Sequence, residues 1–180
     1  MVYVFLADGF EEIEALTPVD LLRRAGVAVT TVGVGNKREI RGSHDVTVLA
    51  DIADADFADD APDMIVLPGG MPGAAHLDTS PVVATALEKA AASGGFLAAI
   101  CAAPMVLGHK GYLAGKKATC YPGFEAELGG ATPQNAPVVR DGRVITGAGM
   151  GVAAEFALAL VGALCGEAAA RSLSRGILKS

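Results

Sequence analysis

Short runs of apolar, often β-branched residues alternate along this chain with longer stretches whose apolar residues recur at helical spacing. The short runs predict buried strands of a parallel sheet, and they occupy Val2–Leu6, Val27–Val34, Met64–Leu67 and Phe96–Ile100. The longer stretches predict helices over Glu11–Ala25, Pro81–Ala92, Ala102–Gly108 and Val152–Leu164. This alternation is typical of one doubly wound α/β domain over residues 1–180, with helices on both faces of a mostly parallel central sheet.

Local signals mark where several helices begin and end. Ser80 followed by Pro81 predicts an N-cap and a first helical residue. Gly26 predicts the end of the first helix, because glycine readily adopts the left-handed conformation found there. Pro18 lies inside that helix and lacks a backbone N–H, so we expect it to kink the helix or split it into two pieces.

Two segments break the alternation of strand and helix. Arg38–Arg41 and Val46–Leu49 predict a small antiparallel hairpin. Val138–Arg140 and Val144–Thr146 predict a second one, because the Asp-Gly pair between them favours a two-residue turn. The acidic stretch Ala53–Pro62 predicts a surface loop or short helix.

Composition restricts the classes of function. The chain is 52% apolar and carries a net charge of −6, which argues against a nucleic-acid surface because such surfaces need clustered Lys and Arg. No apolar run reaches the length of about 20 residues that spans a membrane. The three cysteines are an odd number without CxxC spacing, which does not indicate a disulfide framework. We therefore expect free thiols in a reducing cytoplasm. The apolar N-terminus lacks a basic region and reads as a strand rather than a signal peptide.

Cys101 is the strongest candidate for chemistry. The strand ending at Ile100 runs directly into it, and small residues then allow a helix to start at once, as at the nucleophile elbow of hydrolases. The nearby helix N-terminus is expected to lower the pKa of its thiol. Cysteine is more often a buried structural residue, and we expect Cys120 and Cys165 to be of this kind.

Two further segments follow strands at the same edge of the predicted sheet. Gly69 and Gly70 come after Met64–Leu67, and such a pair lets backbone N–H groups approach a ligand. Glu14 follows the first strand among apolar neighbours, so we expect a partly buried carboxyl with a raised pKa that can donate a hydrogen bond to a thiolate. For Glu11 and Glu12, stabilisation of the helix N-terminus is the simpler interpretation.

No sequence signal indicates a metal or nucleotide cofactor. His44, His76 and His109 lack metal-binding spacing, and there is no phosphate-binding loop. We therefore expect cofactor-independent chemistry.

The same residues carry a family resemblance. The chain resembles the DJ-1/ThiJ/PfpI superfamily, whose members have a flavodoxin-like fold, through motifs in the family's order. The matching segments are Gly9–Glu14, Pro18–Gly26, Val66–Gly70, Ala99–Pro104, Thr119–Pro122 and Glu155–Ala159.

This resemblance implies roles for individual residues. Cys101 would be the oxidisable nucleophile and Glu14 the protonated carboxyl beside it, with backbone donors from Gly70 and Ala102. The pocket would also be lined by Glu11, Arg24, His44, Tyr121 and Gly69. Relatives of this kind are usually cytoplasmic homodimers that pair through the first helix.

The resemblance also implies a choice of functions. The first is a cysteine-dependent enzyme that converts methylglyoxal to lactate without glutathione, or removes early glycation adducts from proteins. The alternative is a redox-sensing, stress-protective protein or chaperone whose Cys101 is oxidised to the sulfinate. A third is an accessory protein with a residual cysteine.

Three positions depart from the family's patterns. Ala102 stands where the protease-like branch has His, so a peptidase lacks its base. Tyr121 replaces a His and His44 replaces an Arg found in relatives close to the human protein. Because Tyr is a poor base near pH 7, these departures leave the assisting base for any turnover unassigned.

Overall fold

A seven-stranded sheet forms the centre of the protein, which we describe over residues 1–179 from a computed structural model. The strand order is β10-β11-β7-β6-β1-β2-β5. All neighbours pair in parallel except β10 with β11. The strands are β1 (Val2–Leu6), β2 (Val29–Gly33), β5 (Ile52–Ala53), β6 (Met64–Leu67), β7 (Phe96–Ile100), β10 (Val138–Asp141) and β11 (Val144–Gly147). The predicted parallel α/β sheet is confirmed.

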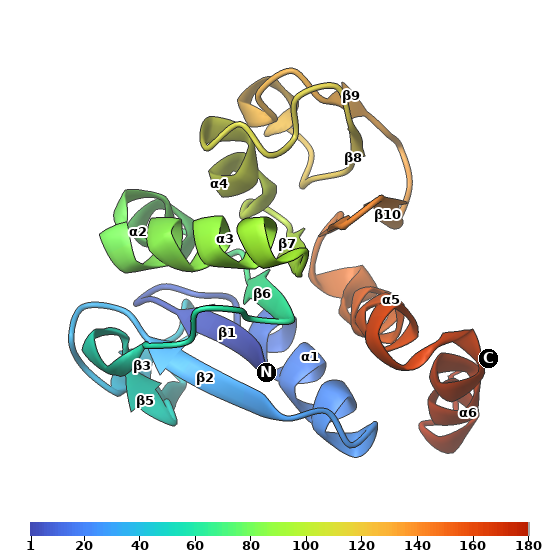
Figure 1. The fold of residues 1–180 in the computed structure, drawn as a ribbon, viewed down its shortest axis with the longest axis horizontal. Coiled ribbons are helices and arrows are strands. Elements are labelled where there is room, and N and C mark those ends of the chain that lie inside the picture. Colours follow the sequence, from blue (N-terminus) through green and yellow to red (C-terminus); the bar gives the residue numbers. More distant parts are fainter. Residues whose placement is uncertain (180) are drawn as a thin grey trace.

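Helices cover both faces of this sheet (Figure 1), as predicted. One face carries α1 (Glu12–Arg24), α5 (Ala153–Cys165) and α6 (Glu167–Gly176). The other carries α2 (Gly73–Thr79), α3 (Pro81–Ser93) and α4 (Pro104–His109). The apolar runs of β1, β6 and β7 are buried because helices pack on both sides of them.

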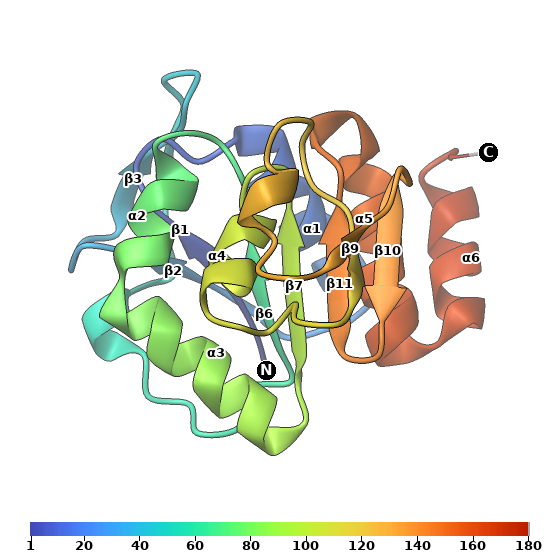
Figure 2. The same cartoon turned by 90° about the horizontal axis from the view of Figure 1, so that it is seen from above.

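Both predicted hairpins are present. β3 (Glu39–Arg41) pairs antiparallel with β4 (Thr47–Leu49), and β10 pairs antiparallel with β11. The predicted acidic loop begins at the last residue of β5 and contains a short 3-10 helix, η1 (Asp54–Asp56). Two more such turns are η2 (Glu125–Glu127) and η3 (Met150–Val152). A ribbon of β8 (Lys117–Ala118) and β9 (Thr132–Pro133) lies beside β10 (Figure 2).

Of the two outcomes expected at Pro18, a kink or a split of the first helix, the split does not occur. α1 runs without interruption from Glu12 to Arg24, with Pro18 buried inside it. The proline removes one backbone hydrogen bond, but Ala15, Val19 and Leu22 of the same helix pack into the core and hold it in place. At α3 the predicted cap is confirmed, because the backbone N–H of Val83 donates to Ser80 Oγ over 3.3 Å.

Several elements were not predicted. The segment after the glycine pair forms α2, and the chain continues after α5 into α6. α4 begins at Pro104 rather than Ala102, so residues 101–103 form a turn before it. Within residues 1–179 no helix combines the length and apolar character needed to cross a membrane.

This topology decides where a site can form. The strands β1, β6, β7 and β11 are neighbours and parallel, so their carboxyl ends lie along one edge of the sheet. Open α/β sheets bind ligands at this edge. The segments that follow β1, β6 and β7 contain Glu14, Gly69 and Cys101, and β11 itself ends at Gly147.

Candidate active site

Cys101 occupies a strained turn at the end of β7. Its φ is 66°, in the left-handed region that non-glycine residues seldom adopt. Neighbouring strands and loops hold it there from both sides. Its backbone N–H donates to the Gly147 carbonyl over 2.9 Å, and its carbonyl accepts from the Tyr121 N–H over 2.8 Å. The turn leaves the side chain half-buried.

Glu14 lies beside this cysteine, fully buried on the first turn of α1. Its Oε2 accepts a hydrogen bond from the Gly69 N–H over 2.9 Å. A Cβ on Gly69 would lie 2.6 Å from both the Cys101 Cβ and the Glu14 Oε2. Only glycine therefore fits between them, and this close packing brings the carboxyl and the thiol together.

Two backbone donors face the sulfur. The N–H groups of Ala102 and Gly70 both donate to the Cys101 thiol and lower its pKa. Gly70 has a φ of 85° and packs so closely that a Cβ would lie 2.4 Å from the Glu11 nitrogen. The structure thus brings Cys101, Glu14, Gly69, Gly70 and Ala102 into one place.

The buried carboxyl and the thiol share their protons. Burial raises the pKa of Glu14 to about 7, although contacts with the Cys101 thiol and the Gly69 N–H act in the opposite direction. Burial and the Glu14 charge raise the pKa of Cys101 to about 12. Between these values the pair holds one proton, because two adjacent negative charges in a buried site repel each other.

The expectation of a lowered thiol pKa at Cys101 is therefore wrong, since burial and the Glu14 charge outweigh the backbone donors. The expected raised pKa of Glu14 is confirmed. A thiolate at Cys101 accordingly requires that the proton of the pair reside on Glu14. In that state the carboxyl can donate to the sulfur, and the repulsion disappears.

Glu12 lies in the first turn of α1, as expected, but it also has a role that we did not expect. It is buried and joins the turn between β3 and β4 to α1. Its Oε1 accepts from the His44 backbone N–H over 2.8 Å, and its Oε2 lies 3.0 Å from His44 Nδ1. Despite the opposing effect of burial, hydrogen bonds from His44 and backbone N–H groups lower the pKa of Glu12 to about 2.

Glu11 and His44 form the charged part of the rim. Glu11 Oε2 lies 3.5 Å from His44 Nδ1, and the Glu11 backbone N–H donates to the Gly69 carbonyl over 2.9 Å. Among residues 1–179, one group of side chains has the proximity to hold a metal ion: Glu11, Glu12 and His44 place one ligand atom each within 4.8 Å of one another. Sequence spacing did not indicate this cluster, because the chain folds back to form it.

Tyr121 also borders the site. Its backbone contacts Cys101, and its side chain is 51% exposed. The ring packs over Gly149, with ring carbons 3.3 and 3.8 Å from the position of a Cβ there.

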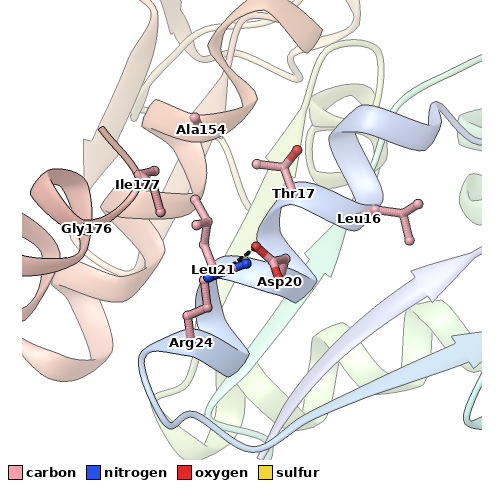
Figure 3. A pocket seen from close by; sticks show the side chains of 8 residues that line it. All are labelled: Leu16, Thr17, Asp20, Leu21, Arg24, Ala154, Gly176 and Ile177. Carbon is pink, nitrogen blue, oxygen red and sulfur yellow. Dashed lines mark hydrogen bonds and ion pairs between the residues drawn. The ribbon is translucent and has the colours of Figure 1, made fainter. Parts of the chain in front are cut away.

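Arg24 lies apart from these residues within the chain. Its Nε pairs with Asp20 Oδ2 over 2.6 Å on the outer side of α1 (Figure 3). Ten residues of helix separate Arg24 from Glu14, or about 15 Å. It lines a groove of about 550 Å³ between α1 and the C-terminal segment, together with Leu16, Thr17, Asp20, Leu21, Ala154, Gly176 and Ile177.

The other two cysteines differ from each other. Cys120 is buried, as expected, and burial with the nearby Glu125 charge raises its pKa to about 11. Cys165 is exposed at the end of α5, so the expectation of a buried cysteine there is wrong.

A comparison against known families shows where the chain belongs. Residues 1–163 match the model of the DJ-1/PfpI family. The chain belongs to this family. The expected family and fold are thereby confirmed, and the match supports a DJ-1-type function.

Individual relatives cover nearly the whole chain. Protein dj-1beta of Drosophila melanogaster is 39% identical over 177 residues, which are 97% of this chain and 95% of that protein. The glutathione-independent glyoxalase DJR-1.2 of Caenorhabditis elegans is 35% identical, over 91% of this chain and 87% of that protein. The solved structure of oxidized Toxoplasma gondii DJ-1 superposes with a TM-score of 0.95 at 35% identity, covering 99% of this chain and 98% of that one.

Proposed function

We propose that this protein is a cysteine-dependent, cofactor-independent enzyme that acts on reactive α-oxoaldehydes, with methylglyoxal converted to lactate, or on their early adducts with protein side chains. The observation that carries this proposal is the proton-sharing pair of Cys101 and Glu14 beneath two backbone donors. The similarity to a glutathione-independent glyoxalase supports it.

The chemistry needs no external oxidant or reductant. The Cys101 thiolate attacks the aldehyde carbon of methylglyoxal, and the carbonyl oxygen takes a proton to form a hemithioacetal. The hydrogen on that carbon then leaves as a proton, and a proton returns to the neighbouring carbon through an enediol. The aldehyde carbon is thereby oxidised to a thioester while the ketone carbon is reduced to an alcohol. Water hydrolyses the thioester, releasing lactate and the thiol.

Each group of the site has a task in this sequence. The N–H groups of Gly70 and Ala102 stabilise the negative oxygen that develops on the substrate. Glu14 carries protons between the oxygen and the carbons, and its pKa near 7 suits both donation and acceptance at neutral pH. The reactive state is the one in which the proton of the pair lies on Glu14 and the sulfur is a thiolate.

The test is to supply methylglyoxal without glutathione, in the presence of EDTA, and to quantify lactate. We expect lactate from the wild-type protein and a loss of about 10³-fold or more with Cys101→Ala, because the covalent intermediate no longer forms. Equal lactate formation by the two proteins would refute the enzymatic proposal.

A second candidate function is redox sensing at the same cysteine. It is favoured by the buried Glu14 Oε1, which has no hydrogen-bond partner among residues 1–179 and is available to donate to an oxygen added to the sulfur. A relative has also been solved in an oxidized form. Mass spectrometry after limited peroxide treatment distinguishes this function, which requires a stable sulfinate on Cys101 in preference to Cys120 or Cys165.

We further propose a cytoplasmic homodimer that pairs through α1. The half-exposed side chains of Ile13 and Leu16 on that helix support this assembly, together with the groove that contains Arg24 (Figure 3). Light scattering at micromolar concentration should give the mass of two chains, and a monomer mass would contradict the proposal.

A further inference from the structure

Three loops at the edge of the sheet have the same unusual composition. They are Gly69–Gly73 between β6 and the start of α2, Thr119–Gly123 after β8, and Gly147–Gly151 at the end of β11. Each consists mainly of Gly, Pro or other small residues, and each carries one large side chain: Met71, Tyr121 and Met150. None of the fifteen positions carries a charge.

These loops all contact Cys101 or the residues that hold it. Met71 follows Gly70, whose N–H donates to the sulfur. Tyr121 donates its backbone N–H to the Cys101 carbonyl. Met150 follows Gly149, on which the Tyr121 ring packs, and the same loop begins with Gly147, which accepts from the Cys101 N–H.

The three large side chains are also unusually exposed. Met71 and Tyr121 are each 51% exposed and Met150 is 53% exposed. Single exposed apolar residues are ordinary on protein surfaces. Here three loops converge on one residue, Cys101, and each presents an exposed apolar side chain. The charged groups of the rim, Glu11 and His44, come from other elements.

We propose that Met71, Tyr121 and Met150 form a subsite for an apolar substituent of the substrate. This inference rests on the function proposed above and narrows its substrate class to α-oxoaldehydes that carry an aryl or larger alkyl group. Methylglyoxal is a minimal substrate whose methyl group touches little of this surface. An aromatic ring offers more apolar surface to these side chains than a methyl group does, and apolar contact strengthens binding in proportion to the area removed from water.

The experiment compares phenylglyoxal with methylglyoxal as substrates. Phenylglyoxal follows the same balanced sequence and yields mandelate in place of lactate. We expect the wild-type kcat/KM to be about tenfold higher for phenylglyoxal, as befits one extra apolar group in a partly open subsite. The rate measured with Cys101→Ala is subtracted from the wild-type rate, because phenylglyoxal also reacts with arginine side chains independently of Cys101.

A double variant tests the residues themselves. Met71→Gln with Met150→Gln keeps the length of both side chains and removes their apolar ends, and we expect the ratio of the two kcat/KM values to fall to about 1. The matched control is Leu49→Gln, a somewhat more exposed apolar position on β4 at 63% exposure, which should leave the ratio unchanged. A wild-type ratio of 1 or less, or a double variant with the wild-type ratio, would overturn the subsite.

A second readout separates this inference from the proposed enzymatic function. Cys101 is alkylated with N-phenylmaleimide and with N-methylmaleimide, and its labelling is followed by mass spectrometry of the Cys101 peptide. A faster reaction with the phenyl reagent, lost in the double variant, supports the subsite even where neither aldehyde is turned over; equal rates refute it. A change in molar mass of the double variant by light scattering also refutes it, because the methionines then cover a contact between copies of the chain.

Discussion

Glu12 and Glu14 lie two residues apart on the first turn of α1, and both are buried, yet their pKa values move in opposite directions. The pKa of Glu12 falls to about 2 and that of Glu14 rises to about 7, from the same starting value of 4.5. Burial disfavours the charged form of both. The difference lies in the donors. Glu12 receives several hydrogen bonds from the β3–β4 turn, whereas Glu14 receives one from Gly69 and faces a thiol.

This contrast separates two uses of a buried acid. Glu12 is kept ionised and joins a hairpin to a helix. Glu14 is left with an unpartnered oxygen, so its proton is available to a neighbour. Perturbed acids often mark functional sites, but here only the partners of each carboxylate distinguish a structural acid from a reactive one.

The largest effect should come from removing the acid at position 14. We expect Glu14→Leu to lower kcat/KM for methylglyoxal by about 10²–10⁴-fold, the usual contribution of general acid–base catalysis. Glu12→Gln is the matched variant, and it should have a much smaller effect because its side chain faces the hairpin. Equal losses of kcat/KM in the two variants, measured by lactate formation, would contradict the distinction between a structural Glu12 and a reactive Glu14.

Glu14 should also destabilise the fold at neutral and alkaline pH. Its folded pKa lies above the unfolded value of 4.5, so its contribution to stability is present below pH 4.5 and is lost as the pH rises to about 7. We expect Glu14→Gln to be more stable than wild type at pH 8 by about 2–3 kcal/mol. Urea denaturation across this pH range would show the decline in wild type and its absence in the variant. A variant less stable than wild type at pH 8 would contradict the assignment.

Glu12 should show the reverse pH dependence. Its folded pKa lies below the unfolded value, so its contribution is present above pH 4.5 and is lost as the pH falls toward 2. We expect Glu12→Gln to unfold more easily at pH 7 by about 1–3 kcal/mol, with little difference from wild type at pH 2. The two Gln variants of α1 therefore change stability in opposite directions near neutral pH. Denaturation curves recorded side by side would reveal this directly.

A more exposed cluster should give the smallest effect. His109 lies between two carboxylates, with Nδ1 2.8 Å from Asp78 and Nε2 2.9 Å from Glu127. Asp78 and then Glu127 raise the pKa of this imidazole, against the effect of burial. Its contribution is therefore present below pH 6.5 and is lost as the pH rises through the raised pKa. Because the ring is 39% exposed and water screens the pairs, we expect His109→Gln to cost about 0.5–1 kcal/mol at pH 6 and less at pH 9. A loss that is larger at pH 9 would contradict this reading of the cluster.

The sequence predicted the fold well where a simple periodic pattern governs structure. β1, β6 and β7 match their predicted bounds because continuous apolar runs determine strands buried on both faces. The same reasoning brought Cys101, Gly69 and Glu14 to one edge of the sheet. The first helix was predicted as well, but not that it continues past Pro18 without a break, because tertiary packing outweighs a local proline signal.

The electrostatics of the site were less predictable. Glu12 and His44 are 32 residues apart, and nothing in their sequence neighbourhood indicates that they meet. The thiol pKa was misjudged because a local signal, the helix after Cys101, was considered without the charge of Glu14 across the site. Arg24 shares a helix with Glu14, but ten residues of helical rise place it in another groove.

The backbone of Cys101 has a consequence for protein engineering. Its φ of 66° is a conformation that this chain otherwise gives mostly to glycine, and in which a side chain costs about 1–2 kcal/mol. A library screened only for thermal tolerance would therefore tend to enrich glycine at position 101 and remove the thiol. Selection for a more stable form of this protein needs a parallel assay for a reactive cysteine, since stability can be gained at the residue on which the chemistry depends.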